Sequence, residues 1–97
     1  MQTQESAAHI ESGNDLLDLI EQNDKSAFTD FYSEYFQKLI LAADKYVKSV
    51  AIAEEIVQDV FLKLWEDKAL LPTIISLKPY LYRSVINASI NAVNRQR

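Results

Sequence analysis

The sequence predicts an all-α protein, a compact bundle of three to four helices. Its single glycine and two prolines are too few for a turn-rich β-protein of 97 residues. Apolar residues recur every three or four positions along most of the chain, which is the period of an amphipathic helix. Hydrophobic residues make up 48% of the chain, enough to form the core of one small domain.

The N-terminal part is expected to hold a tail and a short helix. Residues 1–13 are polar and aperiodic, so we expect a flexible N-terminal tail there. The folded domain then covers residues 14–97 and opens with a short helix over residues 14–22. Asn14 is a candidate N-cap of this helix, and the acidic residues in its first turn favour the helix dipole.

Two longer amphipathic helices follow. Residues 23–49 carry the clearest pattern, a wide apolar stripe rich in Phe and Tyr, which we interpret as core. Residues 51–67, AIAEEIVQDVFLKLWED, form the next helix, with Ser49 as a candidate N-cap. The apolar stripe of this helix ends at Trp65, which we also interpret as a core residue.

The last third of the chain is a connection followed by a fourth helix. Pro72 and the β-branched residues after it favour an extended connection over residues 68–75, and its apolar character indicates that it packs on the helices. The final helix covers residues 76–97, with Ser76 as a candidate N-cap. Pro79 falls in its first turn, where a missing N–H costs little.

Several functional classes find no support in the sequence. Catalytic motifs, a Gly-rich phosphate loop and metal-ligand spacings are missing, so we expect no enzyme activity, no metal and no cofactor. The chain also lacks cysteine, a secretory signal and an apolar run long enough for a membrane span. These features favour a cytoplasmic protein without membrane insertion.

The net charge of −4 hides a separation of signs. Residues 1–67 contain all fourteen acidic side chains and five lysines, a net charge of −9. Residues 68–97 contain five cations and no acid. A basic C-terminal part of this kind indicates contact with a polyanion.

Two helices carry polar side chains that solvation alone does not explain. In the helix over residues 51–67, an out-of-phase leucine lies beside acids and an amide, a mixture typical of a protein interface. The members of this set are Glu54, Glu55, Gln58, Asp59 and Leu62. In the last helix, one face carries asparagines, which are poor helix formers, together with arginines, a composition suited to bases and phosphates. That face consists of Tyr80, Arg83 or Ser84, Asn87, Asn91, Asn94 and Arg95.

Three stretches in this order resemble region 2 of bacterial RNA polymerase sigma factors of the extracytoplasmic-function (ECF) group, in the sigma-70 family. They are AFTDFYSEYFQKLILAADKYV, AEEIVQDVFLKLWED and SLKPYLYRSVINASIN. The resemblance runs from about residue 27 to residue 97. The middle stretch is the most specific, because an acidic pair, an aliphatic pair, Gln-Asp and V-F-L-K-L-W stand in a fixed register.

The resemblance implies a sigma factor domain that acts in transcription initiation. In that family, the helix similar to residues 51–67 docks on the clamp helices, a coiled coil of the RNA polymerase β′ subunit. The docking residues would be Glu55, Gln58 and Asp59, with Glu54 and Leu62 beside them. The helix similar to residues 76–97 faces the minus-ten promoter element and helps to melt it.

The resemblance also implies particular DNA contacts. Asn87 falls at the most characteristic asparagine of the motif, and Asn91 lies one turn further on the same face as Tyr80. Phosphate contacts would come from Arg83, Arg95 and Arg97. Family members capture a flipped non-template base in a pocket beside this helix. Since the chain stops near the end of the helix, we expect much of the loop that selects this base to be missing.

The resemblance leaves the wider setting of the domain open. Complete members carry a C-terminal helix-turn-helix domain, which is absent from this chain, so we interpret the chain as one domain of a longer protein. An anti-sigma factor is a further candidate partner. The alternative is a small helical protein–protein interaction module, a regulator or adaptor without DNA binding. Such a module would need only the acids and the amide on the helix over residues 51–67.

Overall fold

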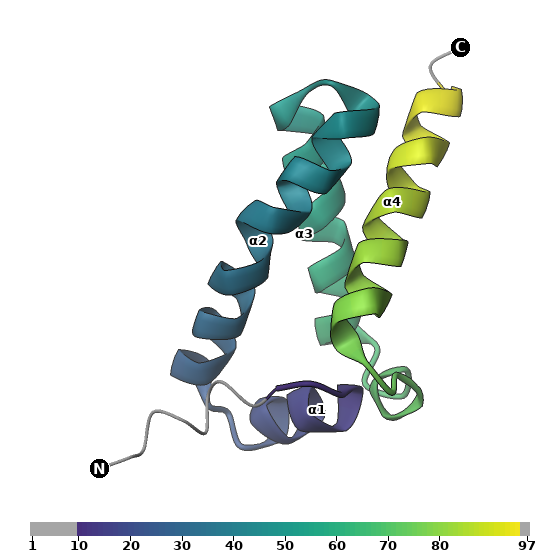
Figure 1. The fold of residues 1–97 in the computed structure, drawn as a ribbon. Coiled ribbons are helices and arrows are strands. Elements are labelled where there is room, and N and C mark those ends of the chain that lie inside the picture. Colours follow the sequence, from purple (N-terminus) through teal and green to yellow (C-terminus); the bar gives the residue numbers. More distant parts are fainter. Residues whose placement is uncertain (1–9, 96–97) are drawn as a thin grey trace.

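The computed structural model describes residues 10–95, and in this range the chain is helical, without strands. This confirms the predicted all-α bundle. The helices are α1 (Gly13–Glu21), α2 (Lys25–Val47), α3 (Val50–Glu66) and α4 (Leu77–Arg95). Helix α2 packs against both α3 and α4, and α1 lies across the foot of these three (Figure 1). None of the helices in the described range has the length and apolar character that a membrane crossing requires.

The segment before α1 belongs to the folded domain. Ile10 is buried, and the N-cap of α1 is Ser12, so the expectation of Asn14 in this role is wrong. The reason is a capping box, in which the Ser12 hydroxyl accepts from the Asp15 N–H and the Asp15 carboxylate accepts from the Ser12 N–H. Asn14 has no acid three residues later. Residues 10–13 of the expected tail are therefore part of the folded structure, and residues 1–9 lie outside the described range.

Helices α2 and α3 form the aromatic centre of the core. The Ser49 hydroxyl accepts from the Ile52 N–H at 3.3 Å, which confirms the predicted N-cap of α3. Phe61 of α3 is almost fully buried and meets two rings of α2 edge-on. Its centroid lies 6.2 Å from that of Phe31 and 4.7 Å from that of Tyr32. Phe31 is buried in the core and most other aromatic residues of the stripe pack against it, as expected, but Tyr46 is 43% exposed.

The connection between α3 and α4 packs on the helices, with Leu71 and Ile74 buried. It is not extended throughout, because Leu71–Thr73 forms a 3₁₀ turn. Pro72 stands at the start of this turn, where its missing N–H leaves no hydrogen bond unmade. Short 3₁₀ turns are common connectors, and here the turn brings both apolar side chains inward.

Candidate interaction surfaces

The polar residues singled out on α3 share one exposed side of the helix. At about 100° per residue, positions 54, 58 and 62 form one row and positions 55 and 59 form the next. The four polar members are exposed, and Leu62 is 51% exposed. The structure thus brings all the residues of this set together. We call them the α3 surface: Glu54, Glu55, Gln58, Asp59 and Leu62.

Apolar side chains adjoin the α3 surface where α3 ends. A hollow of about 220 Å³ is lined by Phe28, Tyr32, Gln58, Phe61, Leu62 and Trp65. Trp65 is 40% exposed, so the interpretation of this residue as core is wrong. Phe28, in the first turn of α2, packs edge-on against the indole, with the ring centroids 4.9 Å apart.

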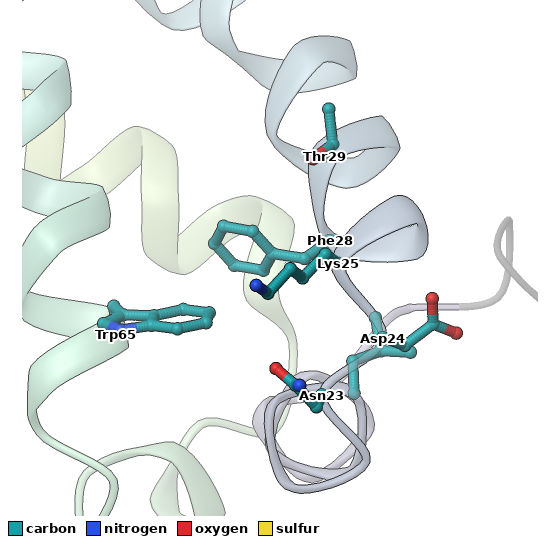
Figure 2. Close-up of a pocket in the computed structure, with 7 residues that line it drawn as sticks. Asn23, Asp24, Lys25, Phe28, Thr29 and Trp65 are labelled. Carbon is teal, nitrogen blue, oxygen red and sulfur yellow. The ribbon is translucent and has the colours of Figure 1, made fainter.

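The other side of the Phe28–Trp65 pair opens into a second apolar hollow, of about 280 Å³ (Figure 2). In Figure 2 the two rings point toward one another from α2 and α3. Leu19 and the turn between α1 and α2 complete the lining of this hollow. Sequence periodicity alone gave no signal for either hollow, because each depends on where a neighbouring helix begins.

Tyr32 contributes a neutral hydrogen-bonding group at the edge of the α3 surface. Burial raises the pKa of the Tyr32 hydroxyl above its usual range, and the nearby Glu54 carboxylate raises the pKa further. The phenol therefore stays protonated at neutral pH and is able to donate a hydrogen bond.

Helix α4 carries the candidate nucleic-acid residues on one side. Tyr80, Asn87 and Asn91 lie within about 40° of one another around the helix, at about 100° per residue. The two asparagines are exposed, and Tyr80 is half-buried. Arg83 and Arg95 flank this row on opposite sides, and both are exposed. We call these five residues the α4 face. Of the other candidates, Asn94 is also exposed on this side of α4, and Arg97 lies outside the described residues.

A groove between α3 and α4 joins the two surfaces. It has a volume of about 290 Å³ and is lined by Ile56, Asp59, Val60, Lys63, Ala88, Asn91, Ala92 and Arg95. Asp59 of the α3 surface and two members of the α4 face therefore share one depression. Lys63 of α3 adds a cation to this groove, and sequence reasoning missed it. The one feature of the sequence that could have indicated it is its position four residues after Asp59, one helical turn further on the same side of α3.

A further hollow lies at the start of α4, and we call it the α4 hollow. It has a volume of about 300 Å³ and is lined by Thr73, Ile74, Ile75, Ser76, Pro79, Tyr80 and Arg83. Two members of the α4 face thus take part in it. The connection supplies the opposite wall, including Ile75, which is 86% exposed. An aromatic ring and a guanidinium in one hollow are groups that stack on a base and neutralise a phosphate.

A family model described as sigma-70 region 2 matches residues 31–97. The chain belongs to the sigma-70 region 2 family. Sigma-70 region 2 is a non-enzymatic domain of sigma factors that acts in transcription initiation, with RNA polymerase and promoter DNA. The match covers both the α3 surface and the α4 face, and it begins after α1. No curated protein and no solved structure gave a significant match to the chain.

Proposed function

We propose that this domain is region 2 of an ECF-group sigma factor, which docks on the β′ clamp helices and recognises and helps to melt the minus-ten element. The observation that carries the proposal is the pair of chemically distinct surfaces within the matched segment. One is acidic and partly apolar, and the other is basic and rich in amides. The assignment to the ECF group is supported by the three sequence stretches that resemble it.

In this proposal the α3 surface binds the polymerase. Leu62 and the apolar hollow beside it supply the centre of the interface, where burial contributes most of the binding energy. The surrounding acids and Gln58 form a polar rim, which steers association and fixes the register with a partner of positive potential. An anti-sigma factor that covered the same surface would compete with the clamp helices.

The α4 face reads the promoter in the same proposal. Its arginines contact phosphates, and its two asparagines, which both donate and accept hydrogen bonds, reach the edges of unpaired bases. Because the two asparagines lie one turn apart on one row, they suit successive nucleotides of a single strand. The family assignment favours this reading over an adaptor without DNA binding.

The α4 hollow is our candidate receptor for the flipped base. Tyr80 would stack on the base, and Arg83 would hold a neighbouring phosphate. From the sequence, we expected the base-selecting loop to follow the last helix. In the present proposal this role falls to residues 73–76, which precede the helix and line the hollow.

The docking half of the proposal is tested by the double variant Gln58→Ala/Asp59→Ala. We expect its affinity for a soluble coiled coil of the clamp helices to fall about tenfold, which corresponds to about 1.4 kcal/mol. The helical circular dichroism should not change, because both side chains are exposed. The matched control is Asp30→Ala/Gln37→Ala, an exposed acid and amide on α2. Equal affinity of both double variants and the unaltered domain would contradict the docking role.

A further inference from the structure

Two backbone hydrogen bonds join residues 11–13, where α1 begins, to residues 74–77, where α4 begins. The Gly13 N–H donates to the Ile74 carbonyl at 2.8 Å, and the Leu77 N–H donates to the Glu11 carbonyl at 2.7 Å. Leu77 is the first residue of α4, so its N–H has no acceptor within its own helix. The two bonds bracket residues 75–76, which are therefore held from both ends by a segment distant in sequence.

Gly13 allows this contact through its lack of a side chain. A Cβ at this position would lie 1.7 Å from the Leu71 carbonyl oxygen and 2.7 Å from the carbonyl carbon. Its backbone does not have a positive φ, so close approach is what requires glycine here. A larger residue would push the turn at Leu71–Thr73 and the start of α1 apart.

The capping box and the core hold the segment in place. The Asp15 carboxylate accepts from the N–H groups of Glu11 and Ser12, at 2.9 Å and 3.1 Å. These bonds fix the peptide unit that contains the Glu11 carbonyl, which accepts from the Leu77 N–H, and the peptide unit before it. Buried side chains on either side of these two hydrogen bonds, from the start of the domain and from the connection to α4, belong to one apolar cluster. They are Ile10, Leu16, Leu71, Ile74 and Leu77.

The bracketed residues form one wall of the α4 hollow. Ile75 and Ser76 lie in this wall, opposite Tyr80 and Arg83 of α4. Because the backbone on both sides of this pair is bonded to residues 11–13, the width of the hollow depends on that segment. The segment lies outside the part of the chain matched by the family model, which begins at residue 31.

We propose that residues 11–13 are a positioning element for DNA recognition. They set the shape of the α4 hollow and thereby its discrimination among bases, without touching DNA themselves. The inference rests on the proposed function, since it takes the α4 hollow as the receptor for a flipped base. It extends the recognition machinery from α4 to the opposite end of the chain.

The test uses the full chain with Gly13→Ala. The probes are short labelled single-stranded oligonucleotides with a minus-ten-like sequence, in which each position carries the four bases in turn. We expect the affinity ratio between the best and worst base at the most selective position to fall at least about fivefold. The dependence of affinity on salt should stay unchanged, because the phosphate-binding arginines are intact. Affinity for the clamp-helix coiled coil should stay within about twofold, because residues 11–13 belong neither to the α3 surface nor to the hollow beside Leu62.

A second variant and a control separate positioning from a general loss of structure. Asp15→Ala removes the carboxylate bonds to Glu11 and Ser12 without a clash and should lower discrimination in the same direction, which decides the matter if Gly13→Ala does not fold. Leu19→Ala shortens an α1 side chain on the Phe28–Trp65 side and should leave discrimination intact. In Gly13→Ala, hydrogen exchange at the Leu77 amide should accelerate.

Three results would overturn parts of this reasoning, and they are distinguishable. Unchanged discrimination in a folded variant whose Leu77 amide exchanges faster would remove the positioning role. A parallel loss of clamp-helix and DNA affinity would reduce the segment to general stabilisation. An unaltered domain that does not discriminate among bases at any position would instead refute the proposed function of the α4 hollow.

Discussion

The exposure of Leu62 gives an expected loss of affinity by which the proposed polymerase interface can be tested. Its side chain is 51% exposed in the free domain. Complete burial of a leucine side chain contributes about 1.5–3 kcal/mol, so covering the exposed half contributes about 0.8–1.5 kcal/mol. Since about 1.4 kcal/mol is a tenfold change in affinity, Leu62→Ala should weaken binding to the clamp-helix coiled coil about four- to twelvefold. Isothermal titration calorimetry with the purified coiled coil measures this change.

Leu41→Ala is the matched control for this experiment. Leu41 is a leucine of similar exposure, 65%, on α2, and by helical spacing it points away from the side that packs on α3 and α4. Both truncations remove atoms that are largely in water already, so neither should shift the thermal unfolding midpoint much. The reasoning is refuted if Leu62→Ala binds as tightly as the unaltered domain. An equal loss in Leu41→Ala would show that the effect is not specific to the α3 surface.

Two further predictions concern stability. Phe61→Ala should lower the free energy of unfolding by about 3–5 kcal/mol, because it empties a buried site between Phe31 and Tyr32. Urea unfolding measures this change, and a loss below about 1 kcal/mol would contradict the packing described. Burial is the main cause that raises the pKa of Tyr32 and Tyr35, so the unfolded chain loses these protons at lower pH than the folded one. The free energy of unfolding should therefore keep its full value below about pH 10 and decrease as the pH rises above it. An increase in the free energy of unfolding with pH in that range would contradict this prediction.

The sequence predicted the features that depend on local pattern. The helix now seen at Val50–Glu66 was expected within one residue at each end, because Ser49 supplies its cap and the apolar residues repeat at helical spacing. The residues of the α3 surface and the α4 face follow from the same periodicity. Each set lies on one helix, so no knowledge of the tertiary structure was needed to place its members together.

The features that sequence reasoning missed depend on contacts between distant segments. Nothing in the local sequence shows that Gly13 meets Leu71, because the two are far apart along the chain. Trp65 was misassigned for a related reason: helical spacing gives the direction of a side chain, but its burial depends on whether another helix reaches that height. The α4 hollow likewise arises from the 3₁₀ turn and the residues it places beside Tyr80.

The central claim, that this sigma-70 region 2 domain reads promoter sequence through α4, is tested most directly by base selectivity of the two asparagines. The measurement is fluorescence anisotropy of single-stranded minus-ten oligonucleotides and scrambled ones, with the unaltered domain and with Asn87→Ala/Asn91→Ala. We expect the unaltered domain to prefer the minus-ten sequence, and the double variant to bind both sequences with nearly equal affinity. A double variant that keeps the full preference would contradict the account.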